Sequence, residues 1–406
     1  MQGDTVTTTC LLCESKNLTL VIDLGYHPLA DTFLKKEDLS LPEETFPLQV
    51  LLCSDCGHAM LSYIVPPEKR YQAHDYSYTS GNSKVAVNHF ADMAKEGSEK
   101  LSLSKDDLVV DIGGNDGTLL KAFESVSGSQ VLNIEPSHNI AAIAKENNIE
   151  TLENFFDEGV ANEIAKRGGA KLITMNNAFN HIGYLREFMG FIKTALTDDG
   201  MFMAEVPYLK TMVELTSFDT IYLEHTSFFL VKPLAQFLKK FDMTIAHLEV
   251  NDYMGGSIRV YMQKGGEESP LVKEYVTKEE EAGLYKKATY DAFMNRVRHF
   301  KFSLCNQLFA IKNSGGVIAG IGAATKGNTL LNYCKIDNSL LEFVTDASPL
   351  KVGKFTPGSH IPIKGDDALN QGITHALILP WNIGEFLKSK LGHLPVEFLV
   401  PQMDIS

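Results

Sequence analysis

The chain has 406 residues, of which 44% are apolar and 22% charged, and its formal net charge at pH 7 is −14. These values predict a globular protein of two or three domains. The acidic balance argues against a nucleic-acid binder, because phosphate contacts need clustered lysines and arginines. No apolar run reaches the roughly 18 residues of a membrane helix, and residues 1–5 do not resemble a secretory signal. We therefore expect a cytoplasmic protein, monomeric or a small homo-oligomer, that binds neither nucleic acid nor membrane.

Residues 1–75 form the first predicted module. Its strand-like runs at 20–22 and 46–52 are brief, and the loops between them are rich in proline and charge. A module this small rarely supplies enough apolar core by itself. We therefore expect a metal ion to hold it together.

Four of the six cysteines lie in this module as two Cys-x-x-Cys pairs: Cys10, Cys13, Cys53 and Cys56. Four thiolates can close a tetrahedral zinc site that keeps no position open for chemistry, so we predict structural Zn2+. The alternative is four unrelated core cysteines. We interpret the neighbouring His58 as a bystander, and Cys305 and Cys334 as isolated small core residues.

Residues 76–264 alternate between strands and helices, which predicts a parallel sheet covered by helices. The predicted strands are 108–112, 131–134, 172–175, 201–204 and 257–262, and helices are expected over 118–124 and 141–146. The polar stretch 265–270 is the predicted linker to a third domain over 270–406. That domain begins with long helical stretches over 274–312 and continues with strands at 317–321, 343–346 and 376–379. The predicted fold class is therefore α/β, with two Rossmann-like domains after the zinc module.

Residues 111–117 read DIGGNDG and join a predicted strand to a helix. Glycines let a ligand approach the backbone, and a helix N-terminus offers free N–H groups. The carboxylate of Glu135, at the end of the next strand, can accept hydrogen bonds from two ribose hydroxyls. NAD and S-adenosylmethionine enzymes share this pattern, although G-G-x-x-G is more like motif I of class I methyltransferases. A tight turn without a ligand is the alternative. We expect cofactor contacts from Asp111, Gly113, Gly114, Asn115, Asp116, Gly117, Glu135 and Asn176.

Two further segments carry polar groups suited to a site. Residues 176–181 (NNAFNH) follow a strand, and ligands of open parallel sheets lie beyond the strand ends, so His181 is a pocket candidate or else an ordinary loop residue. Residues 222–229 (YLEHTSFF) place a phenol, a carboxylate and an imidazole within four positions. Tyr222 and His225 could instead form one face of a packed helix.

The loop at 320–329 (GIGAATKGNT) follows a strand and precedes a predicted helix. Gly322 and Gly327 have the spacing of a P-loop, but Asn328 stands where the phosphate-binding lysine belongs, which argues against ATP hydrolysis. Backbone amides and Lys326 could still hold a diphosphate, and Asp346 could contact a ribose. The predicted substrate-nucleotide contacts are Gly322, Lys326, Asn328 and Asp346. A Rossmann-like domain with only a packing role is the alternative.

Taken together, these motifs resemble the NDP-hexose 3-C-methyltransferase family. The resemblance covers nearly the whole chain and rests on the two cysteine pairs, YQAHDYSYTSG at 71–81, DIGGNDGTLL at 111–120, YLEHTSFF and GIGAATKGNT. It implies a zinc module, a class I methyltransferase core and a C-terminal Rossmann-like domain that binds the nucleotide sugar. The implied reaction is S-adenosylmethionine-dependent methylation at C-3 of an NDP-linked 4-keto-deoxyhexose, in branched deoxysugar biosynthesis.

The residue types fit that chemistry. Carbon can attack a methyl sulfonium only after C-3 loses its proton to give an enolate, so a base and a hydrogen-bond donor are needed. By resemblance His225 is the base, Tyr222 donates to the enolate oxygen and Glu224 orients the sugar, while Tyr76 and His181 line the same pocket. An unperturbed histidine is about half or more neutral at cytoplasmic pH. An NAD-dependent sugar-nucleotide oxidoreductase and a non-catalytic sugar-nucleotide-binding protein stay open as alternatives.

Overall fold

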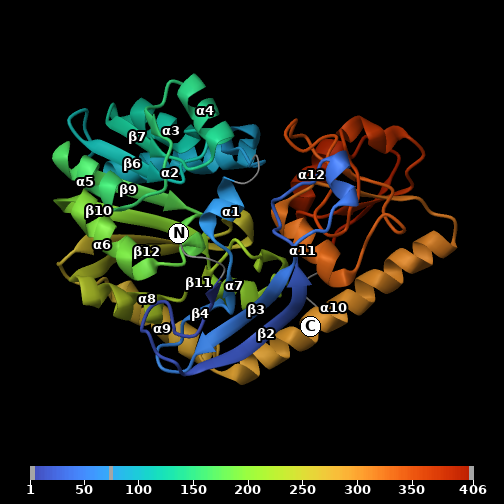
Figure 1. Ribbon diagram of the computed structural model, residues 1–406, viewed down its shortest axis with the longest axis horizontal. Helices are drawn as coiled ribbons and strands as arrows, with labels where there is room; N and C mark the ends of the chain where they lie inside the picture. Colours follow the sequence, from blue (N-terminus) through green and yellow to red (C-terminus); the bar gives the residue numbers. More distant parts are fainter. Residues whose placement is uncertain (1–4, 73–75, 402–406) are drawn as a thin grey trace.

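The computed structural model describes residues 5–72 and 76–401, and Figure 1 shows their arrangement. Residues 73–75 of the 71–81 motif lie outside the described part, as do residues 1–4 and 402–406. None of the helices within the described ranges is long and apolar enough to cross a membrane.

The N-terminal module contains a four-stranded antiparallel sheet in the order β11-β4-β3-β2. In β3 (Phe46–Cys53), Phe46, Leu48, Val50 and Leu52 are buried and the residues between them are less so, as strand alternation requires. The other elements are β1 (Thr5–Val6), β2 (Leu18–His27), β4 (Ala59–Leu61), β5 (Tyr63–Ile64), α1 (Pro67–Tyr71) and the 3-10 helices η1 (Lys36–Ser40) and η2 (Ser80–Asn82).

One strand of this small sheet comes from far along the chain. β11 (Ser227–Phe228) pairs with β4, two residues after His225. The backbone N–H of Leu61 also donates to the Thr226 carbonyl, at 2.9 Å. The N-terminal module therefore holds the backbone of the 222–229 segment directly.

The central part is a seven-stranded sheet in the order β12-β13-β10-β9-β6-β7-β8. β10 is parallel to β9 and antiparallel to β13, and the pairs from β9 to β8 are all parallel. A reversed strand beside β10 is the arrangement of class I methyltransferases and distinguishes this sheet from the dinucleotide-binding order 3-2-1-4-5-6. Its strands are β6 (Leu108–Ile112), β7 (Gln130–Ile134), β8 (Thr151–Leu152), β9 (Ala170–Asn176), β10 (Leu196–Pro207), β12 (Met243–Asn251) and β13 (Ser257–Lys264).

Helices cover both faces of this sheet. On one face, Phe90 and Met93 of α2 pack with Phe123 of α3, and on the other α5 packs against α6. The helices are α2 (Lys84–Leu101), α3 (Thr118–Ser127), α4 (His138–Glu146), α5 (Glu158–Lys166), α6 (Leu185–Ala195), α7 (Leu209–Glu214) and α8 (Val231–Leu238). The 3-10 turns are η3 (Phe179–His181), η4 (Phe218–Thr220), η5 (Lys239–Phe241) and η6 (Tyr253–Gly255).

The C-terminal part is a five-stranded parallel sheet in the order β16-β15-β14-β17-β18. Before it, α9 and the 27-residue helix α10 follow the polar stretch 265–269, and α10 packs against both β2 and α11 (Figure 1). The elements are α9 (Pro270–Glu281), α10 (Lys287–Asn313), β14 (Ile318–Ile321), α11 (Thr325–Cys334), β15 (Val344–Thr345), β16 (Ile363–Lys364), η7 (Asp366–Asn370), β17 (His375–Ile378), η8 (Trp381–Ile383), α12 (Gly384–Leu391) and β18 (Glu397–Leu399).

Cys305 and Cys334 are neighbours rather than isolated residues. Cys334 is buried at the end of α11, and the half-buried Cys305 thiol of α10 donates to its carbonyl at 3.4 Å. Their expected role as small packing residues fits the contact between these two helices.

Candidate active site and zinc centre

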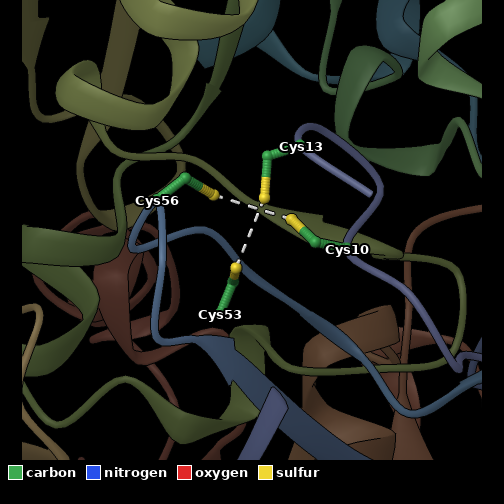
Figure 2. A group of neighbouring side chains, drawn as sticks. All are labelled: Cys10, Cys13, Cys53 and Cys56. Atoms are coloured by element: carbon green, nitrogen blue, oxygen red, sulfur yellow. Dashed lines mark hydrogen bonds between the residues drawn. The ribbon is translucent and has the colours of Figure 1, made fainter. Parts of the chain in front are cut away.

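The four N-terminal cysteines converge on one point, as Figure 2 shows. The sulfur atoms all lie within 4.8 Å of one another, with 3.6 Å between Cys10 and Cys56 and 3.5 Å between Cys13 and Cys53. Zinc–sulfur bonds of about 2.3 Å in a tetrahedron need sulfurs about 3.8 Å apart, so the residues fit Zn2+. His58 is not part of this group, and its Nε2 lies 3.2 Å from the Ser227 hydroxyl.

A cavity of about 980 Å³ lies where the three parts meet. Its wall includes most of the predicted site residues, namely Tyr76, Asp111, Gly113, Gly114, Asn115, Glu135, Asn176, His181, Tyr222, His225, Gly322, Lys326 and Asp346. The first glycine-rich loop, the two histidines and the second glycine-rich loop therefore share one space.

The cofactor end of the cavity is built by the β6–α3 loop. A Cβ on Gly114 would lie 2.4 Å from the Asn133 side-chain oxygen, so only glycine fits there. Asn115 has a φ of 54°, and its backbone N–H donates to Glu135 at 3.2 Å. Burial raises the pKa of Asp111 to about 7, although the Thr174 hydroxyl donates to it at 2.7 Å. Both polar atoms of the Asn176 amide are buried without a partner in the described structure, as expected of groups that await a ligand.

Four predicted contacts do not line the cavity. The Asp116 carboxylate accepts hydrogen bonds from the Gly81 N–H and the Thr118 hydroxyl, and these bonds fix the loop. Gly117 is the N-cap of α3 and has a left-handed backbone conformation. The Asn328 amide donates to the Ala30 carbonyl at 2.7 Å, because α11 packs against the N-terminal module here. These three residues are structural supports rather than ligand contacts.

Glu224 is the fourth predicted contact that does not line the cavity. Its Oε1 accepts from the Asp31 backbone N–H at 3.2 Å, and its side chain lies behind the cavity wall. Burial, together with the charge of Asp31, raises the pKa of Glu224 to about 7. A direct role in orienting a sugar is therefore not supported; Glu224 braces the segment that carries His225.

Residues 222–225 form a turn and not a helix, so the helical-face alternative is wrong. The His225 backbone N–H donates to the Tyr222 carbonyl at 2.9 Å, and the two rings are in contact, with centroids 3.7 Å apart. The His181 and His225 rings are 5.0 Å apart. Burial lowers the pKa of His225 to about 3, so this imidazole is fully neutral near pH 7, whereas the unperturbed pKa predicts an imidazole that is only about half or more neutral.

Two residues at the end of α1 were not assigned a role from the sequence. The Arg70 guanidinium donates to the carbonyls of Glu224, at 3.0 Å, and His181, at 3.2 Å. The Tyr71 hydroxyl lies 2.7 Å from His181 Nδ1. Tyr71 opens the quoted 71–81 motif, but that signal does not say which distant residue it meets.

The other end of the cavity, where the sequence predicts nucleotide contacts, is formed by the start of α11 and the loops after β15 and β17. The half-buried Lys326 donates from its ammonium group to the Met254 carbonyl at 3.1 Å and lies over the Trp381 ring. Lys351, which the sequence did not single out, donates to the Ala323 carbonyl at 2.8 Å and is 3.8 Å from Asp346. Lys390 also lines this end and is 3.5 Å from Asp366, so the cavity has three lysines where an anionic ligand can bind, two of them beside a carboxylate.

The comparisons with known proteins agree with this architecture. A zinc-binding-domain model matches residues 10–71, a methyltransferase-domain model residues 88–248 and a model of the C-methyltransferase C-terminal domain residues 252–396. The chain is 31% identical over 378 residues to C-methyltransferase NovU of Streptomyces niveus, covering 92% of this chain and 89% of that protein. This chain belongs to the C-methyltransferase family.

It is thus an S-adenosylmethionine-dependent C-methyltransferase with a zinc-binding N-terminal domain. Among solved structures, the plantazolicin methyltransferase BpumL in complex with SAH is 11% identical, with a TM-score of 0.36 over 46% of this chain and 88% of that one. A methyltransferase from Clostridium acetobutylicum is 12% identical, with a TM-score of 0.35 over 44% and 92%. These two likenesses are too low to carry an argument about substrate or site.

Proposed function

We propose that this C-methyltransferase methylates C-3 of a 4-keto-deoxyhexose linked to a nucleoside diphosphate, and so makes a branched deoxysugar. The observation that carries the proposal is the shared cavity, which joins a cofactor loop, two neighbouring histidines and a lysine-lined end. A substrate with both an acidic carbon and an anionic group would use all three.

The anionic handle fits the C-terminal end. Ala324, Thr325 and Lys326 line the cavity at the N-terminus of α11, where free backbone N–H groups favour a phosphate. Lys351 and Lys390 line the same end, beside Asp346 and Asp366, and supply ammonium donors for a phosphate. We assign the nucleoside diphosphate to this end and the sugar to the space beside Tyr222 and His225.

The carbon chemistry fits the middle of the cavity. S-adenosylmethionine supplies an electrophilic methyl group when bound. Neutral His225 removes the proton from C-3, and the Tyr222 hydroxyl, kept protonated by burial that raises its pKa well above the ordinary value, donates to the C-4 oxygen as charge moves onto it. The imidazolium that forms in this buried site is stabilised by the adjacent enolate, so proton removal and enolate formation support each other.

The test is to incubate the enzyme with methyl-labelled S-adenosylmethionine and a panel of 4-keto-6-deoxyhexoses that carry thymidine, guanosine or cytidine diphosphates. We expect label in the sugar as a new carbon–carbon bond at C-3, located by NMR of the product. Label on oxygen or nitrogen, or at another carbon, would refute the proposal.

A further inference from the structure

Tyr71 and His181 form a half-buried pair that the mechanism above does not use. The Tyr71 hydroxyl is 2.7 Å from His181 Nδ1, and the two rings stack with centroids 6.1 Å apart and planes inclined by 13°. Tyr71 is the last residue of α1, and His181 ends the η3 turn after β9. The contact therefore joins the N-terminal module to the methyltransferase sheet.

The direction of this hydrogen bond determines where the His181 proton lies. A phenol O–H is a stronger donor than a neutral imidazole N–H, and an unprotonated imidazole nitrogen is a stronger acceptor than a phenol oxygen. Burial raises the pKa of Tyr71, which keeps the phenol protonated, and lowers that of His181, which keeps the imidazole neutral. The phenol therefore donates to Nδ1, and the single imidazole proton is on Nε2.

The Nε2–H group has no partner of its own. The His181 Nε2 atom is buried and makes no hydrogen bond within residues 5–72 and 76–401. The His181 ring lines the cavity. A buried donor without a partner is energetically unfavourable, and a ligand oxygen in the cavity would satisfy it. The His181 Nε2–H group, which has no hydrogen-bond partner in the free protein, is thus suited to donate to an acceptor atom of the substrate.

His225 is the neighbour of His181 in this space. Both rings line the cavity, and 5.0 Å separates their centroids. His225 Nδ1 is also buried without a partner in the described structure. One ligand in the cavity can therefore meet both imidazoles.

We propose that Tyr71 is a positioning residue that fixes His181 in the Nε2–H tautomer, so that this N–H donates, beside Tyr222, to the oxygen on which negative charge develops. His225, as the base of the proposed function, takes the proton from the adjacent carbon. The catalytic consequence rests on the proposed function, but the tautomer does not, because it follows from contacts within the protein.

The first experiment is 15N NMR of protein labelled in its 12 histidines. His181→Asn identifies the His181 resonances by their loss. We expect His181 Nδ1 at the position of an unprotonated nitrogen and Nε2 at that of an N–H, and a shift toward a tautomer mixture in Tyr71→Phe. Tyr26→Phe, at an exposed site on β2, should leave the spectrum unchanged. A protonated Nδ1 in the wild-type protein, or no change in Tyr71→Phe, would overturn the proposal.

The second experiment is kinetic. In Tyr71→Phe, kcat should fall about 10- to 100-fold while the Kd for S-adenosylmethionine and the KM for the sugar nucleotide stay within threefold, because the hydrogen bond matters only as charge develops. An unchanged kcat would contradict the role. Since the NMR experiment needs no substrate, an error in the proposed sugar would not alter its outcome, and if Tyr71→Phe fails to fold the wild-type spectrum still decides.

Discussion

At the scale of single residues, the chemistry depends on groups whose charge is suppressed by burial. His225, His181 and Tyr222 are all kept neutral in this way. Glu224 is held in the same environment, hydrogen bonded to the Asp31 backbone, and its second oxygen has no partner in the described structure. A carboxyl group in such a place is easier to bury as the acid than as the anion.

Glu224 should therefore make stability depend on pH. Its pKa rises from 4.5 to about 7 on folding, so its contribution is fully present below pH 4.5 and is lost as the pH rises through 7. The Gln variant does not titrate. Between pH 5 and pH 8, the free energy of unfolding of Glu224→Gln should gain up to about 3 kcal/mol relative to the wild type, measured by denaturant titration. The exposed Glu146→Gln should show no such gain, and a constant difference for Glu224→Gln would contradict the assignment.

His225 should matter for chemistry and not for cofactor binding. In His225→Asn, kcat should fall about 100- to 10,000-fold because a general base is removed, with the Kd for S-adenosylmethionine within threefold of the wild type. His299→Asn, at an exposed position on α10, is the matched control and should leave both values unchanged. Loss of cofactor binding in His225→Asn would show that the residue supports the fold instead.

At the scale of elements, short-range sequence patterns predict the local secondary structure. The apolar run of β6 followed by glycines predicts a strand, a tight loop and a helix, and all three are present. The pairing of β11 with β4 could not be predicted, because it joins positions more than 160 residues apart and β11 has only two residues. For the same reason no sequence pattern placed Tyr71 beside His181. The turn at 222–225 was ambiguous, since i, i+3 spacing suits both a helix and a single turn.

The loop after β6 offers a test of the cofactor site. In Gly114→Ala, the added Cβ would meet the Asn133 side-chain oxygen at 2.4 Å and Asp111 at 2.9 Å, so the loop must move. We expect the Kd for S-adenosylmethionine to rise at least about tenfold, equivalent to about 1.4 kcal/mol, by calorimetry. Gly190→Ala is the control, because its Cβ would meet nothing within 4 Å and it lies in helix α6. Unchanged affinity in Gly114→Ala would remove this loop from the cofactor site.

At the scale of the whole molecule, the zinc domain reaches the active site through the sheet. The cysteine cluster fixes the ends of β3 and β4, β4 pairs with β11, and β11 begins two residues after His225. α1 of the same module contributes Arg70, which holds the carbonyls on both histidine segments. None of the four cysteines lines the cavity, so a zinc ion held by them would support the residues around the cavity rather than take part in the reaction.

Removal of zinc should therefore lower both stability and activity. Cys53→Ser should lose the metal, reduce the free energy of unfolding by about 3 kcal/mol or more, and decrease kcat more than the affinity for cofactor. Cys305→Ser, which lies outside the cluster, should keep one zinc per chain by metal analysis and retain activity. Full activity of a metal-free Cys53→Ser protein would contradict the link through β4 and β11.

The most direct test of the account is hydrogen exchange at C-3 of the 4-keto sugar nucleotide. The substrate is incubated with enzyme in deuterated buffer without methyl donor, and the C-3 signal is followed by NMR. We expect deuterium to enter C-3 with the wild-type enzyme and not with His225→Asn, although both bind the substrate. Exchange at the same rate in both proteins, or none in a wild-type enzyme that binds the substrate, would contradict proton removal by His225.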